Sequence, residues 1–168
     1  MKGFFKGSAT ALITPFNENG INFDALGELI EHQIAGGTSA IVFLGTTGEP
    51  STMTFEEEHI LMDYAVKKVA GRAKVIFGCG SNNTGDAVMT AKAAEKFGGD
   101  GLLAVTPYYN KCTQNGLVAY YKAICEAVSI PVIAYNVPGR TGVEIQPATM
   151  AKIAEIPNIA GIKDAGGN

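Results

Sequence analysis

Short apolar runs alternate with polar turns and longer helical segments along the whole chain. The apolar runs predict β-strands at residues 8–15, 40–45, 74–79, 101–106, 131–136 and 159–164. The segments between them predict helices at about 24–36, 55–70, 84–97, 116–128 and 147–155. Successive strands begin roughly 30 residues apart, the length of one strand–helix unit. This alternation predicts an α/β fold built on a parallel sheet.

Local signals at the element boundaries support this division. Thr54 is followed three residues later by Glu57, which predicts a capping box at the start of a helix. Thr84 precedes a glycine and an aspartate and predicts a plainer helix N-cap. Pro131 and Pro147 are placed at the starts of a strand and a helix, two positions that tolerate proline.

Two parallel architectures fit this pattern, an open doubly wound sheet and a closed (β/α)8 TIM barrel. The turn after the first strand, residues 14–20, lacks the Gly-x-Gly-x-x-Gly fingerprint of a dinucleotide-binding sheet, which favours the barrel. A barrel needs eight strands, typically in about 250 residues. Because the chain has 168 residues and six predicted strands, we expect residues 1–168 to form an incomplete TIM-barrel catalytic domain whose C-terminal part is absent.

Composition and charge narrow the class of protein. The chain is 46% hydrophobic and 17% charged with a formal net charge of −3, which is typical of a globular domain. It has no basic run, so we expect no nucleic-acid partner. No apolar stretch approaches the roughly 20 residues that span a membrane. Since the first residues also lack the features of a signal peptide, we expect a cytoplasmic protein.

The cysteines and histidines do not form a metal-binding pattern. Cys79, Cys112 and Cys125 are odd in number and include no Cys-x-x-Cys pair, so we expect neither disulfides nor a cysteine metal site. Cys79 lies in an apolar strand and is expected to pack as a small hydrophobic residue. His32 and His59 each fall on a predicted helix, which argues against a histidine metal site.

Lys163 interrupts the apolar strand at residues 159–164. Side chains alternate along a strand, so Ile159, Gly161 and Lys163 are expected to share its inward face. Loss of hydration lowers the pKa of a lysine, and a neutral lysine can attack a carbonyl group to form a Schiff base. Taken alone, the strand favours the other interpretation, a lysine near its end whose ammonium group reaches water.

Further polar side chains follow the predicted strands at their carboxyl ends, where TIM barrels hold their active sites. Residues 45–49 read Gly-Thr-Thr-Gly-Glu, a turn whose N–H groups, with the Thr46 and Thr47 hydroxyls, could bind a carboxylate. Tyr135 is placed to face the barrel interior and could exchange protons with a Schiff base. Arg140 could bind a carboxylate in bidentate fashion. Each also has a purely structural interpretation: a turn, a buried tyrosine and a surface arginine.

Three separated motifs together resemble one known family. Residues 45–49, residues 135–142 (Tyr-Asn-Val-Pro-Gly-Arg-Thr-Gly) and residues 161–164 (Gly-Ile-Lys-Asp) are similar to the dihydrodipicolinate synthase / N-acetylneuraminate lyase family of Schiff-base aldolases. The resemblance runs from about Thr10 to the end of the chain. Within the family, the threonine pair and Arg140 are more typical of the branch that serves lysine biosynthesis than of the sialic acid lyases.

The resemblance implies a role for each catalytic candidate. Lys163 would form an imine with pyruvate, and Tyr135 would donate and accept protons during imine formation and later steps. Thr47 would connect Tyr135 to Tyr109 in a proton relay, with Tyr109 supplied by a neighbouring subunit. No metal and no organic cofactor would be required. The family is commonly a homotetramer.

The resemblance also implies the substrates. The backbone of Thr46 and Thr47 would hold the pyruvate carboxylate, and Arg140 would bind the carboxylate of L-aspartate 4-semialdehyde. The product would be 4-hydroxy-tetrahydrodipicolinate, which leads to diaminopimelate and lysine. Some members are inhibited by lysine through histidines on the helix after the first motif. Here Pro50, Phe55 and Glu58 occur in that region, which argues against such inhibition.

Two alternatives stay open. A related pyruvate-dependent aldolase, such as an N-acetylneuraminate or keto-sugar-acid lyase, would keep the pyruvate imine and use another aldehyde, although Arg140 argues against it. An inactive fragment could instead act as a self-associating half-barrel through its exposed strand edges. With strands missing, we expect this chain not to hold its site at the precision of roughly 0.5 Å that catalysis requires.

Overall fold

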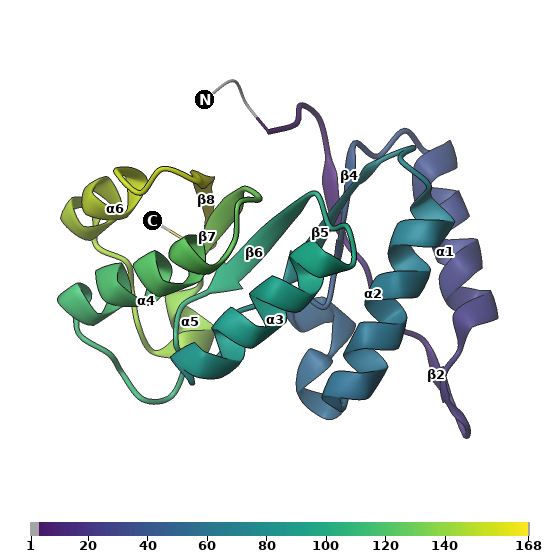
Figure 1. The fold of residues 1–168 in the computed structure, drawn as a ribbon, viewed down its shortest axis with the longest axis horizontal. Coiled ribbons are helices and arrows are strands. Elements are labelled where there is room, and N and C mark those ends of the chain that lie inside the picture. Colours follow the sequence, from purple (N-terminus) through teal and green to yellow (C-terminus); the bar gives the residue numbers. More distant parts are fainter. Residues whose placement is uncertain (1–3, 168) are drawn as a thin grey trace.

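Six parallel strands form the sheet around which the chain folds (Figure 1). The computed structural model describes residues 4–167. The strands are neighbours in the order in which they occur in the chain, and each pairs in parallel with the next. They are β1 (Ala9–Ala11), β4 (Ala40–Phe43), β5 (Lys74–Gly78), β6 (Gly101–Val105), β7 (Val132–Asn136) and β8 (Ile159–Asp164).

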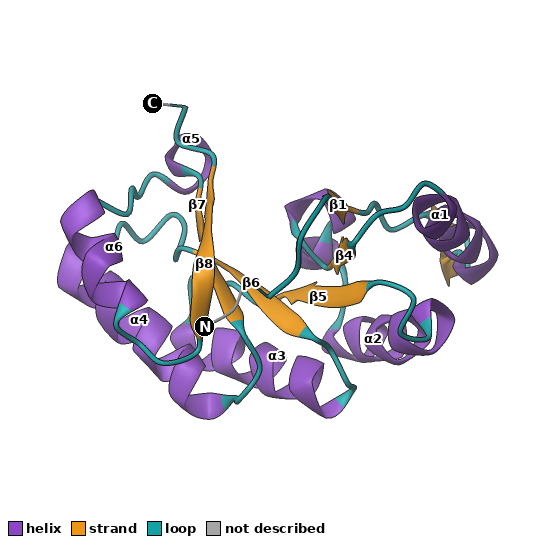
Figure 2. Ribbon diagram, turned by 90° about the horizontal axis from the view of Figure 1, so that it is seen from above, coloured by secondary structure: helices purple, strands orange, loops and turns teal. Residues whose placement is uncertain are grey.

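The helices cover one side of this sheet. Figure 2 shows the strands following a curve, with α1, α2, α3, α4 and α6 along its outer side. A doubly wound sheet would carry helices on both faces and reverse its strand order. The predicted TIM-barrel arrangement is therefore confirmed. The helices are α1 (Phe23–Ala35), α2 (Phe55–Val69), α3 (Thr84–Lys96), α4 (Gln114–Ala127), α5 (Pro138–Thr141) and α6 (Pro147–Ala154).

Several short elements lie outside the six strands and five helices that the sequence predicts. Strands β2 (Phe16–Asn17) and β3 (Gly20–Ile21) form a small antiparallel hairpin before α1. Two 3-10 turns, η1 (Thr46–Gly48) and η2 (Pro50–Thr52), follow β4. The sequence analysis did not predict the hairpin, the 3-10 turns or the four-residue helix α5.

The two faces of the sheet pack against different partners because side chains alternate along each strand. On the outer face, large side chains such as Phe43, Phe77 and Leu102 are buried beneath the helices. On the inner face, Val42, Ile76 and other residues form a smaller apolar cluster. The partly buried side chains of this inner cluster are Phe4, Phe5, Ala11, Ile133 and Tyr135.

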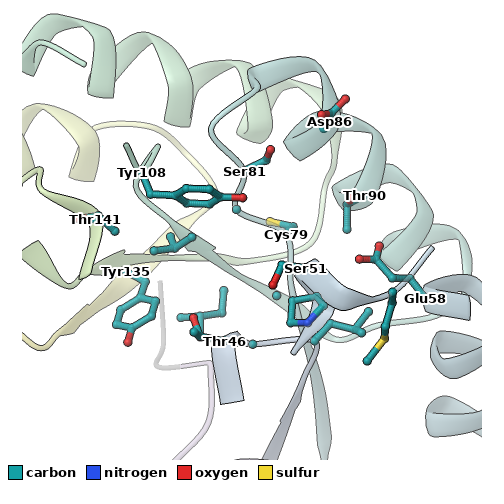
Figure 3. A pocket seen from close by; sticks show the side chains of 18 of the residues that line it. Thr46, Ser51, Glu58, Cys79, Ser81, Asp86, Thr90, Tyr108, Tyr135 and Thr141 are labelled. Carbon is teal, nitrogen blue, oxygen red and sulfur yellow. The ribbon is translucent and has the colours of Figure 1, made fainter. Parts of the chain in front are cut away.

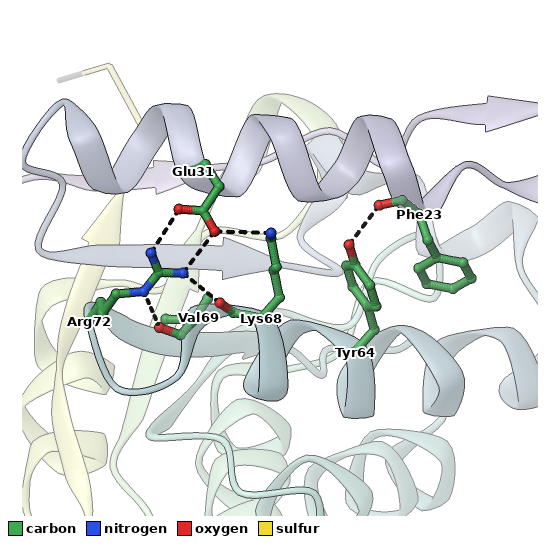
Figure 4. A network of polar contacts seen from close by, with 6 residues as sticks. All are labelled: Phe23, Glu31, Tyr64, Lys68, Val69 and Arg72. Carbon is green, nitrogen blue, oxygen red and sulfur yellow. Dashed lines mark hydrogen bonds and ion pairs between the residues drawn. The ribbon is translucent and has the colours of Figure 1, made fainter.

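An ion-pair network joins α1 and α2 on the outer side (Figure 4). Arg72 donates two hydrogen bonds to the Glu31 carboxylate, at 2.7 and 2.9 Å, and Lys68 Nζ lies 3.0 Å from the same carboxylate. These two cations lower the pKa of Glu31 to about 2. The Tyr64 hydroxyl donates to the Phe23 carbonyl at 2.7 Å, so both ends of the helix pair are connected.

The helix starts test the capping predictions. The capping box is confirmed, since the Glu57 N–H donates to Thr54 Oγ1 at 3.2 Å and the Glu57 carboxylate accepts from the Thr54 N–H at 2.8 Å. Thr84 is not a cap: it is the first residue of α3, and the Asn83 side chain accepts from the backbone of the second. Pro147 begins α6, as predicted.

Strand β8 has one extra residue relative to β7 near its start, so the register between the two strands shifts there. Val132 pairs with Ile159, whereas the next residue, Ile133, pairs with Gly161. The irregularity interrupts the alternation, so the expectation that Ile159 shares a face with Lys163 is wrong. Ile159 instead packs against the outer core. Gly161 and Lys163 pair with residues whose side chains lie on the inner face.

Gly78 is the strand residue with the least room for a side chain. A Cβ atom there would lie 2.0 Å from the carbonyl oxygen of Leu44, whose own backbone is left-handed with φ 53°. Gly78→Ala is therefore expected to lower the free energy of unfolding by about 3 kcal/mol, the upper range for overpacking a core. Chemical denaturation measures the change. Gly161→Ala is the control, because its Cβ would meet no atom within 4 Å, and an equal loss in both variants would contradict the prediction.

Candidate active site

Tyr135 and Lys163 lie side by side at the carboxyl ends of β7 and β8. They are direct partners across the two strands, and both therefore project from the inner face of the sheet. The Nζ atom of Lys163 is 4.3 Å from the centre of the Tyr135 ring. At this distance the aromatic face contacts the amine directly.

The environment of Lys163 differs in one respect from what its sequence context predicts. Partial burial lowers its pKa, as expected for an amine on the inward face. The residue is nevertheless exposed, because β8 is an edge strand of the sheet and its last three strand residues are open to solvent. The amine is partly desolvated rather than held out of water.

A cavity of about 660 Å³ adjoins this pair. Three of the predicted site residues, Thr46, Tyr135 and Arg140, line it. Figure 3 shows Tyr135 and Thr46 near one end of the cavity, with Glu58, Thr90 and Asp86 toward the other. The structure thus brings together groups from three separated segments of the chain, next to Lys163.

The segments that carry Thr46 and Arg140 are short helical turns. Thr46 begins η1, which is closed by a 2.8 Å hydrogen bond from the Gly48 N–H to the Gly45 carbonyl. The Thr14 hydroxyl donates to the Gly48 carbonyl at 2.8 Å and fixes this turn to the segment that follows β1. Arg140 lies in α5, directly after β7, with its side chain exposed at the cavity.

Comparison with known proteins identifies the family. The profile described as the dihydrodipicolinate synthetase family matches residues 4–168. The chain belongs to this family. A 4-hydroxy-tetrahydrodipicolinate synthase of Acetivibrio thermocellus is 54% identical over 163 residues, which cover 97% of this chain and 56% of that protein.

Solved structures of dihydrodipicolinate synthases have the same fold. The enzyme from Aquifex aeolicus matches with a TM-score of 0.95 and 50% identity, over 98% of this chain and 56% of that one. The chloride-inhibited enzyme from Acinetobacter baumannii, complexed with pyruvate, matches with a TM-score of 0.94 and 48% identity, over 96% and 56%. The chain thus spans little more than half the length of these relatives. The family predicted from three motifs is confirmed.

Three of the residues that the resemblance selects are not part of the cavity wall. Within residues 4–167, its lining does not include Thr47, Tyr109 or Lys163, although Lys163 contacts the lining residue Tyr135. Tyr109 is 88% exposed and has a left-handed backbone with φ 70°. Its N–H donates to the Thr141 carbonyl at 3.2 Å, so its loop is attached to the end of α5 while its ring projects into solvent.

Glu58 is a cavity residue to which the sequence analysis gave no role in binding or catalysis. Burial raises the pKa of its carboxyl group to about 7. The sequence contained no signal for this, since Glu58 follows Glu56 and Glu57 in the first turn of α2, where acidic residues are common on exposed faces. It is enclosed by segments distant in the sequence, among them α3, whose Thr90 lines the cavity beside it (Figure 3).

The raised pKa of Glu58 predicts a pH dependence of stability. Its folded pKa of about 7 is above its usual value of 4.5, so the free energy of unfolding falls as pH rises from 4.5 to 7. Glu58→Gln removes this fall and is expected to be more stable than the unmodified protein by about 1 kcal/mol at pH 8, after allowance for partial solvation. Chemical denaturation at pH 4.5 and pH 8 measures the difference. Glu56→Gln, exposed on the same helix, is the control and should retain the fall.

The remaining predicted features concern cysteines, metals and membranes. All three cysteines are free, and Cys79 is buried, where desolvation raises the pKa of its thiol to about 12. Its predicted role as a small packed residue is confirmed. Within residues 4–167, no group of three acidic, histidine or cysteine side chains could hold a metal ion. In the same part of the chain, no helix is long and apolar enough to cross a bilayer.

Proposed function

We propose that the protein condenses pyruvate with L-aspartate 4-semialdehyde to form 4-hydroxy-tetrahydrodipicolinate and water, a step toward diaminopimelate and lysine. The observation that carries this proposal is the Lys163–Tyr135 pair, with the amine 4.3 Å from the ring centre. Membership of the family supports it, as does the pyruvate bound by the relative from Acinetobacter baumannii.

Lys163 is the proposed nucleophile. Its unprotonated Nζ attacks the keto carbon of pyruvate, and loss of water from the resulting carbinolamine gives an imine. Partial burial assists because a lowered pKa increases the fraction of unprotonated amine at neutral pH. The Tyr135 hydroxyl donates the proton that leaves with water, and it accepts one when the pyruvate methyl group becomes an enamine carbon. That carbon then attacks the aldehyde of the second substrate.

The two substrate carboxylates have separate proposed sites. The Thr46–Thr47 segment begins η1, and the first N–H groups of a helical turn have no partner within it, so they can donate to the pyruvate carboxylate. The Arg140 guanidinium, exposed at the same cavity, is free to bind the carboxylate of L-aspartate 4-semialdehyde in bidentate fashion.

Tyr109 and Thr47 complete the proposed proton relay through a second subunit. A ring that is 88% exposed on a left-handed backbone is positioned to enter a neighbouring subunit rather than its own cavity. This supports the proposal that Tyr109 serves the site of another copy. The homotetrameric assembly implied by the resemblance and the cytoplasmic location expected from the sequence stay predictions.

Borohydride reduction in the presence of pyruvate tests the proposed function. The expected result is a stable pyruvate adduct that peptide mass mapping places on Lys163. A folded protein that stays unmodified would contradict the proposal and favour the alternative of a self-associating half-barrel. Steady-state assays with aspartate semialdehyde and with N-acetylmannosamine then distinguish the proposed reaction from that of a related lyase, and Arg140 favours the former.

A further inference from the structure

Directly behind the Tyr135–Lys163 pair lies a second pair of register partners, Asn136 and Asp164. Each is the next residue along its strand, so alternation directs both side chains to the opposite face of the sheet. The Asn136 amide donates to Asp164 Oδ1 at 2.9 Å. Asn136 is only 4% exposed whereas Asp164 is exposed, so this hydrogen bond is a partly buried connection between β7 and β8.

The same asparagine also connects to a third segment. Its Oδ1 accepts a 3.0 Å hydrogen bond from the Ile145 N–H, in the loop between α5 and α6. One side chain therefore links the strand that carries Tyr135, the strand that carries Lys163 and the segment that begins with the Arg140 helix. Asp164 Oδ1 in turn accepts from the Gly166 N–H at 3.0 Å, which fixes the residues after β8.

The register of β8 with β7 is interrupted near its start, and the last three residues of β8 are exposed. The Asn136–Asp164 hydrogen bond acts at that exposed half, one residue beyond Lys163. It acts beside the backbone ladder with β7, which ends in a 2.8 Å hydrogen bond from the Ala165 N–H to the Asn136 carbonyl.

Asparagine is well suited to this position. The buried side chain must donate to a carboxylate with one atom and accept from an N–H with another, and an amide does both. Aspartate at position 136 would bring two carboxylates together. An apolar residue there would leave the Ile145 N–H and the Asp164 carboxylate without their partner.

We propose that Asn136 and Asp164 are positioning residues that hold Lys163 against Tyr135 and fix the Arg140 segment beside them. This inference rests on the proposed function, because it assigns the pair a role in imine formation at Lys163. Both residues act through their neighbours, on the face of the sheet opposite the amine.

The test compares Asp164→Ala with Asp164→Asn in the borohydride assay with pyruvate. Asp164→Ala removes the acceptor and is expected to slow adduct formation at Lys163 by about 10- to 100-fold, the effect of a small misplacement of a reacting group. Asp164→Asn keeps an Oδ1 that can accept both hydrogen bonds and should stay within about 3-fold of the unmodified protein. In Asp164→Ala the pH at which adduct formation is half-maximal should also rise, since a displaced lysine regains hydration.

Asp100→Ala is a matched control at the opposite end of the sheet. Asp100 accepts from Lys74 Nζ at 2.6 Å and from the Val75 N–H at 2.9 Å, so it too connects neighbouring strands through one carboxylate. Its loss is expected to lower thermal stability while leaving the rate and pH dependence of adduct formation unchanged. A merely structural contribution of Asp164 would give the same result as this control.

A second variant covers the case in which Asp164→Ala does not fold. A Cβ atom at Gly166 would lie 3.2 Å from Asp164 Oδ1 and 3.6 Å from Asn136 Nδ2, so Gly166→Ala presses on the pair without removing it. Like Asp164→Ala, Gly166→Ala should slow adduct formation at Lys163. Adduct formation at the unmodified rate and pH in a folded Asp164→Ala or Gly166→Ala variant would overturn the inference alone. Absence of any adduct on the unmodified protein would overturn the proposed function and this inference with it.

Discussion

Lys163→Arg is expected to abolish the pyruvate adduct and to lower turnover at least about 10³-fold. A guanidinium stays protonated at every pH at which the protein is folded, so it cannot attack the keto carbon. The positive charge above the Tyr135 ring is retained, which separates loss of the nucleophile from loss of the contact between the two side chains. Intact-protein mass spectrometry after borohydride reduction measures the adduct.

Lys122→Arg provides the comparison for this substitution. Lys122 lies on α4 and pairs at 3.6 Å with Glu126 one turn away, well outside the cavity. It should form the adduct at the unmodified rate. If the Lys163→Arg protein still acquired pyruvate on reduction, another amine would be the nucleophile and the assignment of Lys163 would be wrong.

Tyr135→Phe is expected to slow imine formation by about 10²- to 10³-fold, the contribution typical of a positioned proton donor. The substitution keeps the ring that contacts Lys163 Nζ and removes only the hydroxyl. The adduct should therefore still map to Lys163 but form slowly. Its rate can be followed by quenching the reaction with borohydride at successive times.

Tyr121→Phe is the control, because it also removes a tyrosine hydroxyl but one that lies away from Lys163. The Tyr121 hydroxyl is buried on the outer side of the sheet and donates to the Ala104 carbonyl at 3.0 Å. Its removal should lower the free energy of unfolding by about 1 kcal/mol without affecting the rate of imine formation. Imine formation at full rate in Tyr135→Phe would show that water or another residue transfers the proton.

The repeating units of this fold could be predicted because their signals are local. Five of the six predicted strands and all five predicted helices begin and end within about two residues of the observed elements, as is usual where apolar runs are bounded by turns. The first strand is shorter than predicted, because the chain turns at Pro15 into the hairpin β2–β3. A hairpin of two-residue strands and a four-residue helix such as α5 have too few residues to show a period.

Features that depend on contacts between distant segments could not be predicted. The extra residue in β8 follows from how that strand aligns with β7, so the outward position of Ile159 has no local signal. The exposure of Lys163 depends on its place in an edge strand. The burial of Glu58 depends on α3 packing beside α2. The motifs placed Thr46, Tyr135 and Arg140 around one cavity, whereas the Asn136–Asp164 connection required coordinates.

The buried thiol of Cys79 has a consequence for the selectivity of the chemistry. Cys79 lines the same cavity as Tyr135, and a thiolate, like an amine, could in principle add to a keto acid. Removal from water affects the two oppositely, since it lowers the pKa of Lys163 and raises that of Cys79 to about 12. Burial in the outer core thus keeps the thiol protonated at neutral pH, so it does not compete with the partly desolvated amine as a nucleophile.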